Sequence, residues 1–490
     1  MLVCATIILV AGTSIAKTTA QASSEPEFEW IQSFDSIIND RAYYVDQTAD
    51  GGYIFTGSTV VTPPGYTELL LVKTDGNGEE SWRNNFPIYM TNLYGNAVHQ
   101  TSDGGYIIVG SIGGMWLWDV QVIKADANGD LVWQKNFGKS DNTDHGYDIL
   151  ETSDGGYIAL GVTTSDELGD FDLWLIKLAA DGTQQWNKTI GGTSNDEPQR
   201  FTKTVDGGYV IVGQTDAADG MGDVWVVKID EDGDVLWQKT YGDSDVTEYG
   251  VCIKTVSNGY IVLGGYQDMN WMESLWVLRL DGQGTLLWDQ LISEEDTTVF
   301  GTSITPTTDG GYFITGNLVT DMETSFTDAY FLKLNHQGAR QWVKTLELSD
   351  GFQDEANFGT QARDGGYVAV GDYGEFLFNC TSDTFILKIE GEKGVVLEDV
   401  TGGLGVHAHV KNLDTTEAQD VSVSFTITGG ILHLINVSYT ETISVPADGA
   451  ETISCKPFLG LGPIDIAVTV NGVTSDYEGK QFILLTKLQS

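Results

Sequence analysis

One ten-residue phrase occurs seven times in this chain of 490 residues, and it constrains the fold more than any other feature. The phrase is clearest as TSDGGYIIVG, which begins at Thr101. Its tyrosines are Tyr53, Tyr106, Tyr157, Tyr209, Tyr260, Tyr312 and Tyr367, so successive copies are 51 to 55 residues apart. This spacing lies just above the roughly 40 to 50 residues of propeller and kelch repeats. The repetition therefore predicts one large repeat array rather than several unrelated domains.

Each repeat divides into four short strands. In the third copy these strands span 146–152, 155–163, 171–178 and 183–190, with turn-forming residues between them. The second strand is apolar at consecutive positions, as at 106–109, so both of its faces must be covered. Blades that pack side by side around an axis provide that cover. We therefore predict an all-β chain built on a β-propeller.

The phrase itself is predicted to form a tight hairpin between the first and second strands. Its first glycine supplies a positive φ, and the fifth copy replaces it with Asn258, the residue type that best tolerates that conformation after glycine. A second hairpin, beginning at Asp75, Asp126 and Asp230 in three of the copies, is expected to join the third strand to the fourth.

A tryptophan marks the fourth strand and predicts how the ring closes. Six copies carry it, at Trp82, Trp133, Trp186, Trp237, Trp288 and Trp342, and the seventh copy lacks it. The missing strand is found at the other end of the chain, because 28–34 resembles 131–137 and Trp30 precedes Trp82 by 52 residues. We expect a seven-bladed propeller over 28–396, closed by the N-terminal strand, which leaves no open sheet edge.

A different pattern begins near Val400. Residues 420–428 and 463–470 alternate apolar and polar side chains, as expected for strands with one buried and one solvated face. About seven such strands fit the last 90 or so residues, which predicts an immunoglobulin-like β-sandwich over 397–490 without the cysteine and tryptophan hallmarks of that fold.

The phrase DGGYIxxG, the WLIK stretch at Trp174 and the glycine pair at Gly191 together resemble the DGGY-type repeats of secreted and cell-surface β-propellers of archaea and bacteria. The tail is similar to adhesion-type, CARDB-like sandwich modules of archaeal surface proteins. The resemblance implies a display or adhesion role, and it brings no catalytic residues with it.

The composition favours an exported protein. Residues 1–22 read as a signal peptide, or as an N-terminal anchor, with a small-x-small cleavage pattern ending at Ala22. The formal charge of −45 argues against nucleic acid and anionic membrane surfaces as partners, and it is typical of a solubility device. The three cysteines after the signal segment do not form a disulfide framework. We expect a monomer located outside the cell or on its surface.

A cation ends the third strand of every repeat: Lys73, Lys124, Lys177, Lys228, Arg279, Lys333 and Lys388. The phrase carries an aspartate in six copies, and the fifth, which has Ser257 instead, is also the copy with Arg279. We predict a tie from each cation to the hairpin aspartate or to a carbonyl of its own blade. A ring of cations lining the channel is the alternative, and it is disfavoured because the third strand is not innermost.

Metal binding is weakly indicated. The stretches that begin at Asp126 and Asp230 resemble the start of a calcium loop, but Phe137 and Tyr241 stand where an EF-hand needs a bidentate glutamate. Hairpin turns are the favoured interpretation, with weak calcium binding left open and no required cofactor or metal site predicted.

The loops after the second and fourth strands are expected to share one rim, which is acidic and carries aromatic residues. Such side chains suit a glycan or a cation-bridged ligand, although solvated loops are the alternative. The candidate ligand-binding residues are Trp116, Trp118, Asp166, Asp170, Asp216, Asp219, Asp243, Asp245 and Trp271. Sequons for N-glycosylation begin at Asn187, Asn379 and Asn436.

No nucleophile elbow, Walker loop or HExxH sequence is present, so no catalytic residue is assigned. We expect a non-enzymatic binding or adhesion module for glycan or protein ligands. A carbohydrate-active hydrolase or lyase on the same ring is the first alternative, and it requires rim acids, or an acid and a tyrosine, that converge in one pocket. A purely structural envelope protein is the second.

Overall fold

The computed structural model describes residues 26–488 apart from 35–38, 62–65, 88–90, 115–116, 139–141, 165–169, 217–220, 244–245, 296, 322–325, 350–351, 376–380, 392–394, 404, 413–417, 430–434, 447–448, 456–459, 471–472 and 484. The described residues form strands joined by turns and short connections. The predicted signal segment at 1–22 lies outside them.

Seven four-stranded antiparallel sheets repeat along the described part of residues 28–389. The first three, each given from its first strand, are β2 (Asp40–Gln47), β3 (Tyr53–Val61), β4 (Tyr66–Thr74) and β5 (Glu80–Phe86); β6 (Asn92–Gln100), β7 (Tyr106–Gly113), β8 (Trp118–Ala125) and β9 (Leu131–Phe137); and β10 (Asp144–Glu151), β11 (Tyr157–Thr164), β12 (Phe171–Leu178) and β13 (Gln184–Ile190).

The next three sheets continue this pattern. They are β14 (Asp196–Lys203), β15 (Tyr209–Asp216), β16 (Gly222–Ile229) and β17 (Val235–Tyr241); β18 (Thr247–Val256), β19 (Gly259–Gln267), β20 (Glu273–Asp281) and β21 (Leu286–Ile292); and β22 (Val299–Pro306), β23 (Tyr312–Asp321), β24 (Phe326–Leu334) and β25 (Arg340–Leu346).

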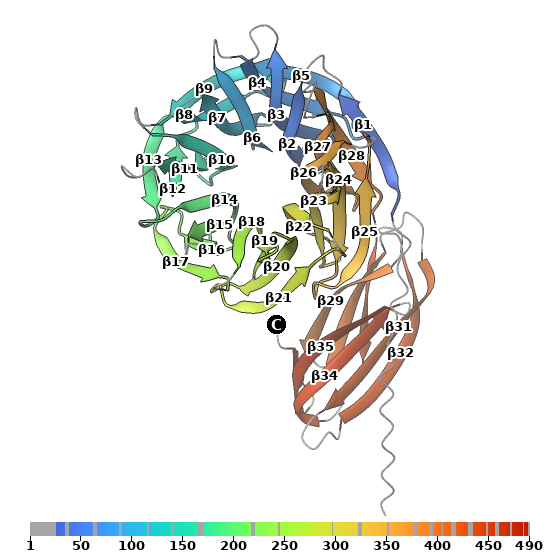
Figure 1. Ribbon diagram of the computed structural model, residues 1–490. Helices are drawn as coiled ribbons and strands as arrows, with labels where there is room; N and C mark the ends of the chain where they lie inside the picture. The colour runs from blue at the N-terminus through green and yellow to red at the C-terminus, as the bar shows by residue number, and fades with distance from the viewer. Residues whose placement is uncertain are drawn as a thin grey trace, which may run out of the picture.

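The seventh sheet joins the two ends of the repeat region. It contains β26 (Gln353–Gln361), β27 (Tyr367–Glu375), β28 (Thr381–Ile389) and, outermost, β1 (Phe28–Phe34). β1 runs antiparallel to β28 with Ile31 opposite Leu387, so the predicted pairing of the N-terminal strand with the last sheet is confirmed. Figure 1 shows the sheets around a central axis, with the first strand of each toward the centre and the last at the periphery. This arrangement is that of a β-propeller.

The described residues from Val395 onward form two further sheets. β29 (Val395–Gly403), β30 (Gly405–Asn412) and β33 (Ala450–Cys455) make one; β31 (Ala418–Gly429), β32 (Ile435–Val445), β34 (Gly460–Val470), β35 (Val473–Ile483) and β36 (Leu485–Leu488) make the other. That is eight strands where the sequence suggested about seven. Val421, Val423, Phe425 and Ile427 are buried, as their alternation predicted. They share one core with three buried side chains of β30, namely Val406, Ala408 and Val410.

The fourth-strand tryptophans hold neighbouring sheets together. The indole of Trp82 lies 5.7 Å, between ring centroids, from Tyr106 of the next sheet, and Trp288 lies 6.2 Å from Tyr312 in the same way. A Cβ added to Gly129, in the hairpin of the next sheet, would stand 2.4 Å from the Trp82 ring. The recurrence of tryptophan therefore reflects contact between sheets rather than packing within one sheet.

The threonine, the aspartate and the two glycines of the repeated phrase each have an identifiable structural role. In the second copy the Thr101 hydroxyl and the Gly105 N–H both donate to Asp103 Oδ1, at 2.5 and 2.9 Å. Gly104 has φ of +83°, and in the fifth copy Asn258 takes its place at +61°, as predicted. Gly105 is required for a different reason, because a Cβ there would meet the Ala125 carbonyl oxygen at 2.4 Å.

The predicted ties between strand-three cations and hairpin aspartates are confirmed. Lys124 Nζ lies 3.1 Å from Asp103 Oδ1 and 3.0 Å from the Ala125 carbonyl oxygen, and its side chain is almost fully buried. Five other lysines repeat the aspartate pair: Lys73 with Asp50, Lys177 with Asp154, Lys228 with Asp206, Lys333 with Asp309 and Lys388 with Asp364. Because these ammonium groups are buried within their own sheets, the alternative of a cation-lined channel is wrong.

These ties set the ionisation of the aspartates. Burial alone would raise the pKa of Asp103, but hydrogen bonds from Thr101, Gly105 and Lys124 outweigh it and lower that pKa to about 2. The same groups in the first sheet lower the pKa of Asp50 to about 2. Asp50 and Asp103 are therefore charged throughout the physiological pH range.

Candidate functional site

The two edges of the ring differ in chemistry. The glycine hairpins between first and second strands and between third and fourth strands lie on one edge, which we call the hairpin rim. The connections after the second and fourth strands lie on the other edge, which we call the variable rim. This division follows from the alternating strand directions, as the sequence predicted.

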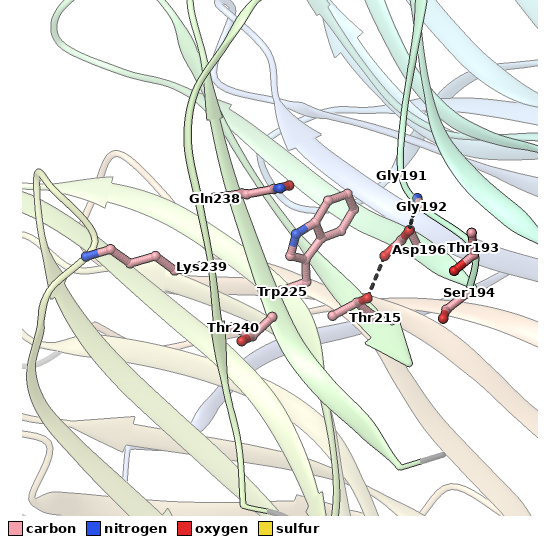
Figure 2. A pocket seen from close by; sticks show the side chains of 10 residues that line it. All are labelled: Gly191, Gly192, Thr193, Ser194, Asp196, Thr215, Trp225, Gln238, Lys239 and Thr240. Carbon is pink, nitrogen blue, oxygen red and sulfur yellow. Dashed lines mark hydrogen bonds between the residues drawn. The ribbon is translucent and has the colours of Figure 1, made fainter. Parts of the chain in front are cut away.

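A pocket of about 440 Å³ opens on the variable rim at the fourth sheet. Figure 2 shows Trp225 of β16 in its middle, with the 191–194 connection on one side and the outer strand β17 on the other. Its further lining residues are Asp196, Thr215, Gln238, Lys239 and Thr240. Hydroxyl, amide and carboxylate groups thus surround a single indole.

The acid of this pocket is held in a fixed orientation. Asp196 is buried at the start of β14, where one carboxylate oxygen accepts from the Gly192 N–H at 2.7 Å and the other from the Thr215 hydroxyl at 2.5 Å. A Cβ on Gly191 would lie 1.8 Å from Asp172 Oδ1, so any larger residue in this turn would displace the Asp172 side chain. The pocket is therefore shaped by the backbone of the connection between sheets.

The indole N–H of Trp225 differs from its counterparts in adjacent sheets. Trp174 Nε1 donates to Asn187 Oδ1 at 3.3 Å, and Trp276 Nε1 donates to Asp289 Oδ2 at 3.0 Å. Among the residues that the structure describes, Trp225 Nε1 has no such acceptor, and Gln238 stands at the position of Asn187 and Asp289. An oxygen atom of a ligand in the pocket can accept from this N–H.

Trp271 occupies an unusual backbone conformation on the same rim, one sheet further on. It has φ of +64° and is 77% exposed. Asp268 caps the turn, accepting from the N–H groups of Asn270 and Met272 at 2.8 and 2.9 Å. The hairpins between third and fourth strands on the opposite rim contain the same type of aspartate-capped turn, with glycine at the corresponding position, as at Gly78 and Gly129. An exposed tryptophan is therefore kept here at a cost in backbone strain.

Trp118, another candidate from the sequence, belongs to an aromatic cluster. Its ring centroid lies 5.6 Å from that of Tyr94 and 5.6 Å from that of His145. The indole is half-buried, and burial lowers the pKa of His145, so the imidazole is neutral at physiological pH. The cluster spans the second and third sheets and is separate from the pocket at Trp225 in sequence and in lining residues.

The described acidic candidates are dispersed around the rim. Asp170 is half-buried before β12, Asp216 accepts from the Asn195 side-chain amide at 3.0 Å, and the exposed Asp243 donates its N–H to Glu248 at 3.2 Å. Burial and then the Asp216 charge raise the pKa of the neighbouring Glu197. The candidates Trp116, Asp166, Asp219 and Asp245 lie outside the described residues.

The asparagines of the three sequons lie in different parts of the chain. Asn187 is exposed on the outer strand β13, and Asn436 lies on β32 opposite Thr428. Asn379 lies outside the described residues. Glycosylation at these positions stays a prediction.

An acid and a tyrosine converge at one place on the variable rim, in the fifth sheet. The Tyr249 hydroxyl donates to Glu273 Oε1, and burial raises the pKa of Glu273 to about 8. Glu273 is 3% exposed, and neither residue lines the described pockets. The pair thus brings together an acid and a tyrosine, with the acid almost fully buried.

The innermost strands place charged and aromatic groups at the centre of the ring. Tyr44 stacks on Phe358 with centroids 4.0 Å apart, and the Arg200 guanidinium lies 5.5 Å from the Tyr44 ring. Asp148 and Asp46 each lie 3.4 Å from a nitrogen of His99. Burial alone would lower the pKa of His99, but these two carboxylates raise it to about 9. The charge of His99 is therefore paired with two carboxylates.

Metal binding gains no support at the turns that resembled calcium loops. Asp126 Oδ1 accepts from the N–H groups of Asn128 and Asp130 at 2.8 and 3.0 Å, which is the capping of a hairpin turn. Among the described residues, no group of three or more histidine, cysteine, aspartate or glutamate side chains is arranged to hold a metal ion. Within that same part of the chain, no helix is long and apolar enough to cross a membrane.

The pocket at Trp225 was not predicted from the sequence. The available signal was the tryptophan three residues before the strand-three cation, which occurs in the third, fourth and fifth sheets as Trp174, Trp225 and Trp276. What distinguishes Trp225 is its neighbour Gln238 and the glycine-rich 191–194 connection, and both come from other elements.

Fold and rim together define a repeat β-propeller with a polar, indole-containing pocket on its loop-bearing edge. No protein-family model matches this chain, and no curated protein matches it. Solved structures, in contrast, match this chain. The β-propeller domain of the Trilobed protease from Pyrococcus furiosus is 10% identical, with 73% of this chain and 95% of that chain covered and a TM-score of 0.41.

Two further solved structures illustrate the range of similar proteins. The WD40 domain from Toxoplasma gondii coronin is 8% identical, covering 76% of this chain and 90% of that chain at a TM-score of 0.43. Puromycin hydrolase is 12% identical, covering 77% of this chain and 61% of that chain at 0.47. Likenesses this distant carry no inference about activity, and by name they include both a hydrolase and a WD40 domain.

Proposed function

We propose that this protein is an exported cell-surface propeller that binds glycans without chemically altering them. The observation that carries the proposal is the pocket at Trp225, where one indole is surrounded by hydroxyl, amide and carboxylate groups. Trp225 is only 4% exposed, so it offers the pocket its indole N–H rather than an open ring face. The hydroxyls at the rim of a sugar ring suit this donor together with the few placed polar groups around it.

The finer architecture belongs to the same proposal. Seven four-stranded sheets with β1 paired to β28 support a seven-bladed propeller closed by its N-terminal strand. The two sheets after Val395 support an immunoglobulin-like sandwich of the adhesion type. The resemblance to DGGY-type surface proteins and the signal-like residues 1–22 support export, and the net charge of −45 fits a solvated extracellular protein.

A neutral sugar is the ligand class that this pocket fits best. Asp196 is the single carboxylate among its lining residues and Lys239 the single cation, so the lining carries no net charge of either sign. Trp225 Nε1 supplies a donor, and the exposed Gln238 and Thr240 supply groups that both donate and accept.

Binding without catalysis is favoured by the distribution of acids. A glycosidase commonly uses two carboxyl groups about 5 to 9 Å apart on either side of the scissile bond. The pocket lining contains Asp196 alone, and its two oxygens already accept hydrogen bonds from Gly192 and Thr215. The buried pair of Tyr249 and Glu273 does not line this pocket.

A glycan array probed with the purified protein, with and without calcium, tests the proposal. We expect binding to neutral glycans, and we expect Gln238→Ala to weaken it about tenfold, the equivalent of about 1.4 kcal/mol. Gln134→Ala, at the matching position of the second sheet, is the control and should bind as the wild type does. No glycan bound, or equal loss in both variants, would contradict the site, and release of shorter sugars from a bound glycan would favour the enzyme alternative.

A further inference from the structure

The fifth sheet departs from the repeat on the hairpin rim. In the second sheet the first hairpin pairs Gln100 with Tyr106 around a capped aspartate turn. In the fifth sheet Val256 pairs with Gly259, which leaves Ser257 and Asn258 as a two-residue loop with no aspartate. The hairpin is therefore shorter, and the carboxylate that would meet the strand-three cation is missing.

Arg279 takes the place of the lysine in this sheet. Its guanidinium donates to the carbonyl oxygens of Ser257 and Leu280 and, at 3.3 Å, to that of Tyr260. Among the described residues, no carboxylate lies within ion-pair distance of it, whereas the six equivalent lysines all have one. Backbone carbonyls satisfy three of the five guanidinium N–H groups but do not neutralise the charge.

Cavities lie on both sides of the shortened hairpin. One of about 700 Å³ separates it from the fourth sheet and is lined in part by Val205, which is 96% exposed. The other, of about 650 Å³, separates it from the sixth sheet, and Arg279 lines it. Arg279 thus lines an open space within the usual size range of small-ligand pockets.

The lining of the second cavity offers three kinds of contact. Arg279 provides a positive charge. Asp281 and Thr307 provide oxygen atoms that can accept hydrogen bonds from ligand hydroxyls. Leu287 and Pro306 provide an apolar wall. Asp281 is already oriented by the N–H groups of Gln283 and Thr285 at 2.8 and 2.7 Å, so it stays in place as an acceptor. Burial lowers the pKa of His336, which also lines the cavity, so this imidazole adds no charge near pH 7.

We propose that the cavity beside Arg279 binds a hexuronic acid unit of an acidic glycan. The carboxylate pairs with Arg279, ring hydroxyls donate to Asp281 and Thr307, and the apolar face of the ring lies against Leu287. A simple polyanion fits less well, because Asp281 and the overall charge of −45 repel it, whereas a uronic acid combines one negative charge with several hydroxyl donors. The site lies on the hairpin rim, opposite the pocket at Trp225, and does not depend on the proposed function of that pocket.

Calorimetric titration of the full chain with sodium D-glucuronate tests the proposal, with D-glucose as the neutral control. We expect a dissociation constant of about 1 mM for glucuronate, weakening as salt is added, and no detectable binding of glucose at this site. Leu287→Asp adds a negative charge at the mouth without removing an internal hydrogen bond, since Leu287 is 52% exposed. It should weaken glucuronate at least about tenfold.

Val132→Asp is the matched control, because Val132 holds the same strand position in the second sheet and is 57% exposed. It should bind glucuronate as the wild type does, and so should Gln238→Ala, which separates this site from the pocket on the variable rim. Absence of glucuronate binding, or equal weakening in both aspartate variants, would overturn the proposal. Tighter binding of a short peptide through its terminal carboxylate than of glucuronate would also overturn it, by replacing the sugar with a peptide.

Discussion

The indole of Trp30 lies 6.0 Å, between ring centroids, from the phenol ring of Tyr53, across the junction between the last sheet and the first. A Cβ added to Gly78 would stand 2.4 Å from Trp30, as one added to Gly129 would from Trp82. The junction that closes the ring is thus built like the junctions within it. The same tryptophan contacts with tyrosine and glycine occur at the closing junction and at the junction between the first and second sheets. Closure therefore requires only the pairing of β1 with β28.

The two glycines of the phrase should respond differently to alanine. At Gly104 a Cβ would meet nothing within 4 Å, so Gly104→Ala should cost only the strain of a positive φ, about 1–2 kcal/mol in unfolding free energy. At Gly105 a Cβ would meet a backbone oxygen at 2.4 Å, so Gly105→Ala should cost about 3 kcal/mol or more. Urea unfolding followed by circular dichroism measures both. Equal losses of unfolding free energy in the two variants would mean that the contact of a Cβ with the backbone oxygen is not what requires glycine at position 105.

Acid should weaken the ties between lysine and aspartate. The folded pKa of Asp103 is about 2, below its unfolded value of about 3.9, so the tie contributes fully above about pH 4 and is lost as the pH falls toward 2. Because the Asp103 side chain is 64% exposed, Asp103→Asn should cost only about 0.5–1 kcal/mol at neutral pH. Unfolding free energies measured from pH 5 to about 2 should fall less steeply in Asp103→Asn than in the wild type. If the unfolding free energy of Asp103→Asn fell with pH as steeply as that of the wild type, protonation of Asp103 would not contribute to the loss of stability in acid.

Alkali should weaken the centre of the ring through His99. Its folded pKa of about 9 exceeds the unfolded value of about 6.5, so its contribution is complete below about pH 6.5 and is lost as the pH rises through 9. Burial also raises the pKa of Asp372, to about 8, which adds loss of stability in the same direction up to that pH. His99→Gln should flatten the decline above pH 6.5 without abolishing it. An NMR pH titration that gave His99 a pKa near 6.5 would contradict its pairing with Asp46 and Asp148.

The positive φ of Trp271 should lower the stability of the protein while keeping the indole exposed for contact with a ligand. Replacing it with glycine relieves the positive φ, so Trp271→Gly should raise the unfolding free energy by about 0.5–1 kcal/mol, after allowance for the entropy of glycine in the unfolded chain. Trp271→Ala keeps the strain and, because the side chain is 77% exposed, should change stability little. If this indole contacts ligand, both variants lose binding to the same extent. Greater stability in the alanine variant than in the glycine variant would exclude backbone strain as the cause.

The features that repeat could be predicted from the sequence, and the features that occur once could not. The hairpin conformation of Asn258, the buried lysine ties and the partner strand of β1 all follow from comparing equivalent positions of the chain. The pocket at Trp225 depends on which side chains the adjacent connection and outer strand present, and among the described residues no other sheet repeats that combination. The contact of His99 with Asp148 joins residues 49 positions apart whose counterparts in other sheets differ in type, so no pattern indicated it.

The central structural claim is that the ring is closed through β1, and one comparison of stabilities tests it most directly. Trp30→Ala and Trp82→Ala remove equivalent half-buried indoles, one at the closing junction and one inside the repeat, and their unfolding free energies can be measured side by side in urea. A closed ring predicts that each variant loses about 2–3 kcal/mol and that the two losses agree within about 0.5 kcal/mol. A Trp30→Ala variant as stable as the wild type, beside a destabilised Trp82→Ala variant, would contradict closure.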